Sequence, residues 1–410
     1  VLIVGSGGRE HAIAHALKSS PRVGRLAFAG GDNAGLEAIA ERLPAEPDAV
    51  AKLAPEFDLV VVGPEAPLVD GLADRLRAIG VPVVGPGAVG AQLESSKAFT
   101  KGICAEAGIP TAHASICHSL HDAMAALHTM GAPIVVKADG LAAGKGVVVA
   151  ETMAEAKSAI SACFSGAFGD AGATVVLEER LVGPEVSLFA LADGKTVVPL
   201  ASARDYKRAF DGDEGPNTGG MGAISPAPDV SDELLAEAME TVVRPTVAAL
   251  AKRGIAYQGI LYAGLMLTKE GPKLIEFNVR LGDPEAQAVL PRLQTDPFEL
   301  FYAVATGGLA DIEIALSAAW CVAVVVAAAG YPEAVKKGEV IGGLDLVEAR
   351  GAAVLHAGTM RADGNVLSNG GRVLAVVAQG SSPTEARERV YGALSGLDWP
   401  GGRMRSDIAG

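Results

Sequence analysis

The stretch VKADGLAAGKGV at residues 136–147 is the most informative part of this chain for its fold and its chemistry. Two lysines, Lys137 and Lys145, bracket a loop of small residues with three glycines, and an apolar run lies on each side. Small residues let the backbone close around phosphate groups, and lysines add positive charge. No Ser or Thr follows Lys145, and a strand is expected where a Walker A loop needs a helix. We therefore predict a phosphate-binding loop between two strands; the alternative is an ordinary hairpin with solvated lysines.

Further along the chain, the sequence IEFNVR at residues 275–280 alternates strictly between apolar and polar residues. On a β-strand, Glu276, Asn278 and Arg280 then share one face. Carboxylate and amide oxygens suit Mg²⁺, which is usually held by few protein groups together with nucleotide phosphates. An arginine on the same face can stabilise a transferring phosphoryl group. We predict a metal and phosphoryl-transfer site here; the alternative is an amphipathic strand with a solvated outer face.

The N-terminal region alternates short apolar runs with helix-like segments up to about residue 95, and glycines end several of the runs. This pattern predicts a doubly wound parallel sheet, whose ligands bind at the carboxyl ends of the strands. The turn GSGG at residues 5–8 offers backbone N–H groups to an anion, and Glu65 follows a later strand at the same sheet edge. Glu10 stands where the dinucleotide-binding fingerprint needs a small residue, which argues against a nicotinamide dehydrogenase.

The middle of the chain predicts two hairpins, around residues 193–194 and 269–271, and a long helix over residues 231–253. A polar, glycine-rich loop is expected over residues 204–223, and loops of this length inside a compact domain tend to be functional. Successive N–H groups near residues 217–220 can form an anion-binding nest. The last part of the chain is rich in short strands.

The composition excludes several classes of protein. The chain has 410 residues and a formal net charge of −14 at pH 7, and aromatic residues make up 4%. An acidic chain with few aromatics is a poor candidate for binding nucleic acid or an anionic membrane. The four cysteines, Cys104, Cys117, Cys163 and Cys321, are too widely spaced for a zinc site or a disulfide framework, which indicates reduced thiols in a cytoplasmic protein. No signal peptide is expected, and the longest apolar run is too short to span a bilayer.

Taken together, these motifs resemble those of the ATP-grasp superfamily and, within it, the phosphoribosylamine–glycine ligase family. The resemblance extends over essentially the whole chain. The matching strings are GGREH at 7–11, VGPEAPL at 62–68, SKAFTK at 96–101, KADGLAAGKGV at 137–147, GPNTGGMGA at 215–223, GDPE at 282–285, HAGT at 356–359 and NGGRV at 369–373.

The resemblance implies an α/β fold with three parts. An N-terminal doubly wound parallel-sheet domain, Rossmann-like and substrate-binding, is expected over residues 1–96. A two-lobed ATP-grasp domain is expected over residues 97–312, with a mobile lid lobe at about 115–185, and a small β-rich C-terminal domain over 313–410. A monomer is expected.

The resemblance also implies the reaction. ATP phosphorylates the carboxylate of glycine, and the amine of 5-phosphoribosylamine then displaces phosphate, with Mg²⁺ or Mn²⁺ as the metal. Arg280 and Lys145 have the catalytic roles, and Glu276 and Asn278 hold the metal. Further ATP contacts are expected at Lys97, Lys137, Lys145 (phosphates), Gly140, Gly144, Gly146 (the loop), Glu178, Glu179, Leu181 (adenine), Glu185 (ribose) and Asn278. The pockets for glycine and phosphoribosylamine are expected at Gly7, Gly8, Glu65, Asp205, Asn217, Thr218, Gly219, Arg280, Gly282 and Asp283.

The chain departs from the family pattern at a few positions. Ser6 stands where the family commonly has Asn, and Tyr206 where it usually has His. Many ATP-grasp enzymes carry an acidic residue on the strand before the metal strand, and here the comparable position is Gly264, a gap that this family shares. The number of bound metal ions therefore stays open.

Other functions must be distinguished from this one. An ATP-grasp carboxylase or a different carboxylate–amine ligase would keep the fold and change the acceptor, but the long loop over residues 204–223 favours the family named above. A binding module without catalysis is disfavoured because Lys145, Glu276, Asn278 and Arg280 are all present.

Overall fold

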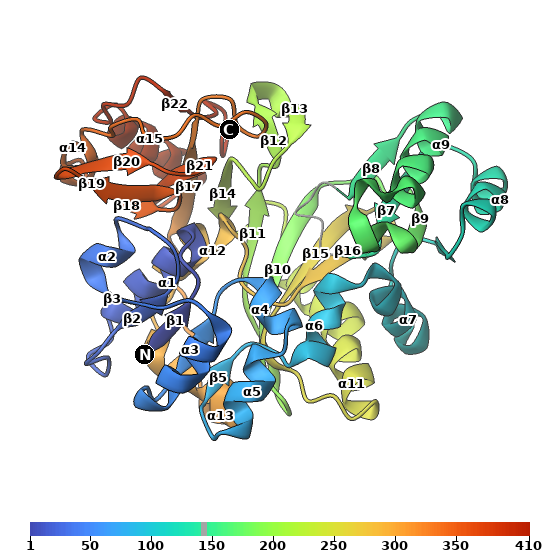
Figure 1. Cartoon of the computed structure of the whole chain (residues 1–410), viewed down its shortest axis with the longest axis horizontal. Helices are drawn as coiled ribbons and strands as arrows, with labels where there is room; N and C mark the ends of the chain where they lie inside the picture. Colours follow the sequence, from blue (N-terminus) through green and yellow to red (C-terminus); the bar gives the residue numbers. More distant parts are fainter. Residues whose placement is uncertain (141–145) are drawn as a thin grey trace.

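The N-terminal part of the chain folds as a five-stranded parallel sheet in the order β3-β2-β1-β4-β5 (Figure 1). The structure, a computed structural model, describes residues 1–140 and 146–410. Helices cover both faces of this sheet: Leu2 and Val4 pack in one core with Leu72 and Leu76, whereas Ile3 packs in a second core that includes residues of the first helix. The prediction of a doubly wound parallel sheet is therefore confirmed. Its strands are β1 (Leu2–Val4), β2 (Ala27–Ala29), β3 (Glu41–Leu43), β4 (Val60–Val62) and β5 (Val83–Val84).

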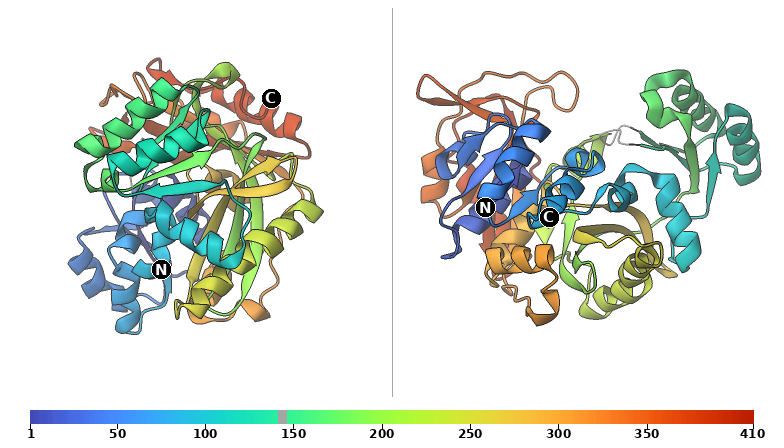
Figure 2. Two further views of the ribbon diagram at one scale, coloured as in Figure 1. Left: turned by 90° about the vertical axis from the view of Figure 1, so that its right-hand side faces the viewer. Right: turned by 60° about the horizontal axis from the view of Figure 1, so that its bottom comes forward.

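A small lobe with its own core projects from the rest of the chain (Figures 1 and 2). Its antiparallel sheet has the order β6-β9-β7-β8. Two helices, α8 (Leu120–Met130) and α9 (Met153–Ala162), pack on this sheet, and their apolar residues fill the lobe's core. The strands are β6 (Ala114–Cys117), β7 (Ile134–Ala138), β8 (Val147–Ala150) and β9 (Val175–Glu179), and β7 and β8 pair on either side of the predicted phosphate loop.

A nine-stranded sheet joins the middle and the end of the chain. Its order is β16-β15-β10-β11-β14-β17-β21-β18, with β22 paired to β17. The pairing of β14 with β17 makes the strands of the C-terminal part continue the sheet of the middle part, a connection that the sequence pattern did not predict. The strands are β10 (Glu185–Asp193), β11 (Val197–Asp205), β14 (Gly222–Ser225), β15 (Gln258–Thr268), β16 (Gly271–Asn278), β17 (Trp320–Ala328), β18 (Ala353–His356), β21 (Arg372–Gly380) and β22 (Gly402–Arg403).

Both predicted hairpins are confirmed as β10–β11 and β15–β16, but the expected loop over residues 204–223 contains more structure than predicted. A short hairpin of β12 (Arg208–Phe210) and β13 (Glu214–Asn217) lies within it. The predicted helix over residues 231–253 runs as α10 (Asp232–Ala238) and α11 (Arg244–Lys252) with a π-helical turn between them.

The remaining elements connect these sheets. No helix within residues 1–140 and 146–410 is long and apolar enough to cross a membrane. The other helices and strands are α1 (Gly8–Lys18), α2 (Leu36–Ile39), α3 (Pro47–Leu53), α4 (Glu65–Val69), α5 (Leu72–Ala78), α6 (Ala88–Ser95), α7 (Lys97–Ala107), α12 (Glu285–Val289), α13 (Pro297–Thr306), α14 (Leu344–Ala349), α15 (Pro383–Leu394), β19 (Thr359–Ala362) and β20 (Asn365–Ser368).

Candidate active site

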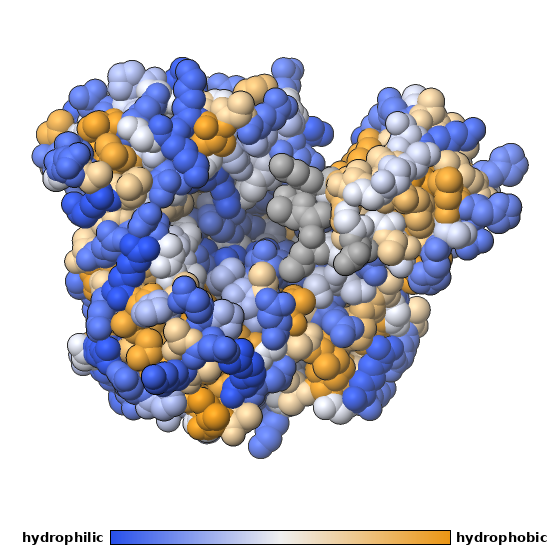
Figure 3. Space-filling view, viewed as in Figure 1, coloured by the Kyte–Doolittle hydropathy of each residue, from blue (hydrophilic) through white to orange (hydrophobic). Residues whose placement is uncertain are grey.

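A hydrophilic hollow lies between the N- and C-terminal parts of the chain on one side and the lid lobe, β6–β9 with α8 and α9, on the other (Figure 3). Most of the predicted site residues are on the elements around it. They form three neighbouring groups: lysines at the root of the lid lobe, a polar face of β16, and a cavity between the two ends of the chain.

The lysine group is organised around one buried carboxylate. Glu178 on β9 accepts from Lys137 Nζ on β7 at 2.8 Å and from Lys101 Nζ on α7 at 3.2 Å. All three side chains are less than a tenth exposed, so two cations share one anion in a poorly solvated place. Burial lowers the pKa of Lys101 even though Glu178 opposes the shift. The excess positive charge suits a bound polyphosphate.

The phosphate loop is anchored to the start of α7. Asp139 accepts from the backbone N of Ala98 and from Ser96 Oγ, both at 3.1 Å, and Lys97 Nζ donates to the carbonyl of Gly140 at 3.1 Å. Burial lowers the pKa of Lys97, with Glu276 acting in the opposite direction. These contacts hold Lys97 at the first residue of the loop that is predicted to bind phosphates.

Two glycines at the ends of this loop have clear structural roles. Gly140 has φ +156°, and a side chain there would meet Ala171 Cβ at 2.5 Å. The carbonyl of Gly146 accepts from the backbone N of Ala138 at 2.8 Å, which closes the loop. Gly144 and Lys145 lie outside the described residues.

The polar face of β16 is centred on Arg280, which follows the strand. Its guanidinium donates to Asn278 Oδ1 at 3.0 Å, to Glu94 Oε1 at 2.6 Å and to Glu65 Oε2 at 3.2 Å. Burial acts to lower the pKa of Arg280, but Glu94 and Glu65 outweigh it and raise the pKa above its ordinary value. The second oxygen of Glu94 accepts from the backbone N of Val279 at 2.8 Å. Two carboxylates thus fix the arginine, and Glu94 was not among the predicted site residues.

Glu276 is half-buried, and its surroundings favour the ionised carboxylate. Burial opposes ionisation, yet Lys207, Lys137 and Lys97 together lower the pKa of Glu276 below its ordinary value. The backbone pairs Glu276 with Gly264 on β15, where a Cβ would lie 3.5 Å from Glu276 Cγ, so the position that lacks an acid is beside the predicted metal ligand. Within residues 1–140 and 146–410, no cluster of three His, Cys, Asp or Glu side chains could hold a metal.

A lysine that was not predicted connects two predicted residues on β10 and β11. Lys207 Nζ forms an ion pair with Glu185 and lies 3.9 Å from an oxygen of Asp205. Burial raises the pKa of Asp205 to about 7 against the effect of Lys207, and the carboxylates of Glu285 and Glu185 add to this rise. In turn, Asp205 and Glu185 raise the pKa of Lys207 although burial acts to lower it.

A cavity of about 320 Å³ lies where the N- and C-terminal parts of the chain meet. The glycine turn after β1 forms one wall, and a side chain at Gly8 would meet Gln287 Nε2 at 2.6 Å. Gln287 donates to Asp283 Oδ1 at 2.7 Å, and its buried Oε1 has no hydrogen-bond partner in the described part of the chain. The lining residues are Ser6, Gly7, Gly8, Asp32, Asp283, Ala357, Gly358 and Arg372.

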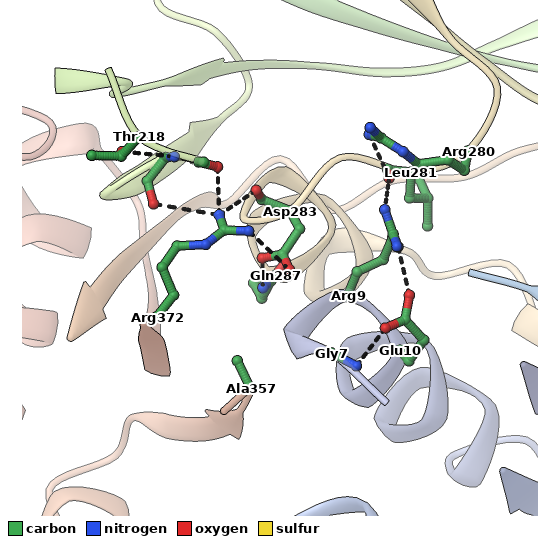
Figure 4. A network of polar contacts seen from close by, with 12 residues as sticks. Gly7, Arg9, Glu10, Thr218, Arg280, Leu281, Asp283, Gln287, Ala357 and Arg372 are labelled. Atoms are coloured by element: carbon green, nitrogen blue, oxygen red, sulfur yellow. Dashed lines mark hydrogen bonds and ion pairs between the residues drawn. The ribbon is translucent and has the colours of Figure 1, made fainter. Parts of the chain in front are cut away.

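Arg372, at the start of β21, bridges this cavity to the glycine-rich segment before β14 (Figure 4). Its guanidinium donates to the carbonyls of Gly219 and Asp283 and lies 3.3 Å from the Asp283 carboxylate. Thr218 Oγ1 donates to the carbonyl of Lys207 at 2.8 Å, which ties the same segment to the ion pairs on β10 and β11. Arg372 was not predicted, although it is the arginine of the NGGRV string.

The remaining predicted residues are dispersed around these groups. Asn217 is exposed on β13, opposite Arg208, and does not line the cavity. Glu179 is exposed and accepts from the backbone N of His113 at 3.0 Å, whereas Leu181 is half-buried beyond the end of β9. Gly7 N donates to Glu10 Oε2 at 2.5 Å. Gly282 leaves room for Glu285, whose Oε2 would lie 2.3 Å from a Cβ there.

Family models match most of the chain, and a solved structure covers 99% of it. Models described as the N domain, the ATP-grasp (A) domain and the C domain of phosphoribosylglycinamide synthetase match residues 1–94, 95–286 and 321–410. A Brucella melitensis protein named phosphoribosylamine–glycine ligase is 50% identical over 414 residues, covering 100% of this chain and 97% of the relative.

The crystal structure of phosphoribosylamine–glycine ligase from Thermotoga maritima superposes with a TM-score of 0.87 at 33% identity and covers 99% of both chains. A biotin carboxylase from Campylobacter jejuni, solved as a β,γ-ATP complex, has a TM-score of 0.75 at 15% identity over 98% of this chain and 92% of that one, a likeness of fold alone.

The three-part fold, the lysine-lined lid root and the polar face of β16 define an ATP-grasp enzyme. With the matches of its N, ATP-grasp and C domains, the chain belongs to the phosphoribosylglycinamide synthetase family, whose curated members are named phosphoribosylamine–glycine ligases.

Proposed function

We propose that this protein joins glycine to 5-phosphoribosylamine at the expense of ATP, giving glycinamide ribonucleotide, ADP and phosphate in purine biosynthesis. The proposal rests on two sites of different character that lie next to each other around Arg280. A lysine-rich site at the lid root suits a nucleotide, and a cavity between the chain's two ends suits a small polar substrate. Asp283, three residues after Arg280, lines that cavity.

In the first step a carboxylate oxygen of glycine attacks the γ-phosphorus of ATP, the bond from that phosphorus to the bridging oxygen breaks, and ADP leaves, which gives glycyl phosphate. Lys97, Lys137 and Lys145 bind the phosphates, and adenosine lies along Glu178, Glu179, Leu181 and Glu185. Arg280, held by Glu65 and Glu94, stabilises the negative charge of the transferring phosphoryl group. Because two carboxylates fix the guanidinium before substrates bind, little reorganisation is needed during the reaction.

In the second step the amine of phosphoribosylamine attacks the acyl carbon of glycyl phosphate. A C–N bond forms, the C–O bond to the phosphoryl group breaks, and phosphate leaves while the amine loses a proton. Gly7, Gly8 and Asp283 line the sugar-phosphate cavity, and Glu65, Asp205, Asn217, Thr218, Gly219 and Gly282 complete the two substrate pockets. Holding both reactants in one closed site accounts for most of the rate gain, so no side-chain nucleophile is needed.

Glu276 and Asn278 fit a divalent ion, because an ionised carboxylate and an amide oxygen share one face of β16 close to the lysines that would bind phosphates. Bound Mg²⁺, or Mn²⁺ in its place, would neutralise phosphate charge on the nucleotide. Asn278 Oδ1 already accepts from Arg280, so the arginine also orients this amide.

We further propose that the protein works as a monomer in the cytoplasm. The four cysteines are free and buried, as expected for a reducing compartment. Light scattering after gel filtration should give the mass of one chain, and a mass of two chains would contradict the monomer.

The test of the proposed reaction is phosphate release with ATP, Mg²⁺, glycine and freshly made phosphoribosylamine, each omitted in turn. We expect release only when all are present, together with a product that contains the glycyl group. Release that does not depend on glycine, or that other amino acids support equally well, would contradict the assignment.

A further inference from the structure

The cavity that the proposed function assigns to phosphoribosylamine has walls from opposite ends of the chain. Ser6, Gly7 and Gly8 follow β1, whereas Ala357 and Gly358 follow β18. The width of the cavity therefore depends on how these two segments are held together.

One buried side chain binds both walls. Asn33, in the loop after β2, is 0% exposed. Its Nδ2 donates to the carbonyl of Ser6 at 2.9 Å, to that of His356 at 2.9 Å and to that of Ala357 at 3.3 Å. Ser6 and Ala357 both line the cavity, so a single amide group contacts the backbone of each wall.

The other half of the same side chain fixes the loop that carries it. Asn33 Oδ1 accepts from the backbone N of Gly35 and of Leu36, both at 3.0 Å. The two ends of the amide therefore have different roles that a substitution can separate: Oδ1 orders the loop, and Nδ2 joins the two walls of the cavity.

Two neighbouring contacts connect the same segments. Thr359 Oγ1 accepts from the backbone N of Ala34 at 3.1 Å, and His11 Nδ1 accepts from the backbone N of His356 at 2.7 Å. Thr359 is 0% exposed. Both contacts bind the C-terminal wall to N-terminal elements, but neither reaches a carbonyl that lines the cavity, as Asn33 does.

We propose that Asn33 is a positioning residue for the sugar-phosphate substrate: its amide sets the distance between the Ser6 and Ala357 walls. The proposal rests on the proposed function, since it assigns phosphoribosylamine to this cavity. Asn33 does not line the cavity and acts through the two carbonyls that it holds. The lysines proposed to bind ATP, Lys97 and Lys137, do not line this cavity, so the affinity for ATP should not depend on this amide.

The test is Asn33→Asp, which keeps the oxygen acceptor for the loop and removes the donor to the walls. We expect the KM for phosphoribosylamine to rise roughly ten- to a hundredfold, because a carbonyl on each wall loses its donor. The KM for ATP should stay within about twofold. An unchanged KM for phosphoribosylamine, or an equal change in the KM for ATP, would overturn the proposal.

The matched control is Asp193→Asn, an amide–carboxylate exchange at another buried loop-capping residue. Asp193 accepts from the backbone N of Lys195, Thr196 and Leu309, at the turn between β10 and β11. It should lower stability without a selective effect on phosphoribosylamine. If this control raises the same KM selectively, the effect of Asn33→Asp is one of general stability and the proposal fails.

A second pair of variants decides the matter if Asn33→Asp does not fold. Thr359→Val keeps the shape of the side chain and removes the acceptor for Ala34, and Thr359→Ser restores it. The valine variant should raise the KM for phosphoribosylamine by several fold, and the serine variant should return it towards the wild-type value. A valine variant with wild-type KM would overturn the proposal. Failure of the proposed function can be distinguished from failure of the Asn33 proposal, because the wild-type protein would then show no turnover.

Discussion

The nucleotide side and the sugar-phosphate side of this active site are held together by different kinds of contact. At the lid root, Glu178 pairs with both Lys101 and Lys137, which leaves an excess of positive charge in a poorly solvated place. Around the cavity, most contacts join a side chain to a backbone carbonyl, and the donors are Asn33 and Arg372. ATP binding should therefore depend on the charges at the lid root, and phosphoribosylamine binding on the shape of the cavity.

Arg280 lies between the two sides, and its removal should have the largest effect. Arg280→Ala should lower kcat on the order of a thousandfold, because developing charge on the phosphoryl group loses its fixed partner. ATP binding, measured by calorimetry, should change little. Arg253→Ala, which removes an exposed arginine paired with Glu106, is the control and should behave as wild type. Intact turnover in Arg280→Ala would remove this residue from the mechanism.

The nucleotide side can be altered selectively at Lys137. Lys137→Met leaves Glu178 with Lys101 as its cation and should weaken ATP binding roughly ten- to a hundredfold, as expected for a lost charged hydrogen bond. The KM for phosphoribosylamine should stay within about twofold. Calorimetric titration with ATP measures the first value, with Lys252→Met at the exposed end of α11 as the control. Equal weakening of both substrates would mean that the two sides are not independent.

The cavity can be altered by adding a single methyl group. In Gly8→Ala the new Cβ would lie 2.6 Å from Gln287 Nε2, so Gln287 must move and its bond to Asp283 is disturbed. The KM for phosphoribosylamine should rise about tenfold, while ATP binding is unchanged. In Gly392→Ala in α15, no atom of the described residues outside the helix's own backbone lies within 4 Å of the added Cβ, so this variant should leave both values alone and stabilise the fold by about 0.5–1 kcal/mol. A Gly8→Ala enzyme with wild-type kinetics would show that the turn after β1 accommodates a side chain without changing phosphoribosylamine binding.

The smallest effect concerns the buried histidines behind the cavity. Burial lowers the pKa of His11 to about 3, with His356 and His15 adding to the effect, and burial lowers that of His356 to about 4. Because an unfolded histidine titrates near 6.5, the unfolded chain binds these protons first. Stability is therefore fully present above about pH 6.5 and is lost as the pH falls towards 3.

The thermal unfolding midpoint from pH 7 to pH 4 measures this loss. His11→Asn, which offers an amide oxygen in place of Nδ1, should show a shallower fall than wild type, and His128→Asn at an exposed position should not. Identical slopes in all three proteins would mean that the buried histidines do not contribute.

The sequence could predict candidate site residues that lie close together in the chain, but not those whose contacts join distant parts of it. Glu276 and Asn278 lie two residues apart on β16 and Arg280 follows the strand, and the phosphate loop lies within one string of twelve residues, so local patterns were enough to predict these candidates. Glu94 and Arg372 could not be found this way. Glu94 meets Arg280 across 186 positions of sequence, and Arg372 contacts mainly backbone carbonyls, which every residue carries.

Asn33 is the clearest case of a residue hidden from the sequence. It contacts the carbonyl of His356 across 323 positions, and an asparagine before Ala and Gly in a loop reads as a turn residue. The continuation of the central sheet from β14 into β17 was missed for the same reason, because pairing between distant strands leaves no local pattern.

The two sides of the site form one active site in which ATP phosphorylates the glycine carboxylate and the amine of phosphoribosylamine then displaces the phosphate. The most direct measurement uses glycine labelled with ¹⁸O in both carboxylate oxygens, together with ATP and phosphoribosylamine, and mass analysis of the released phosphate. Transfer through glycyl phosphate predicts one ¹⁸O atom in each phosphate released. Phosphate without label would contradict the account, because the phosphoryl group would then have passed to water or to another acceptor.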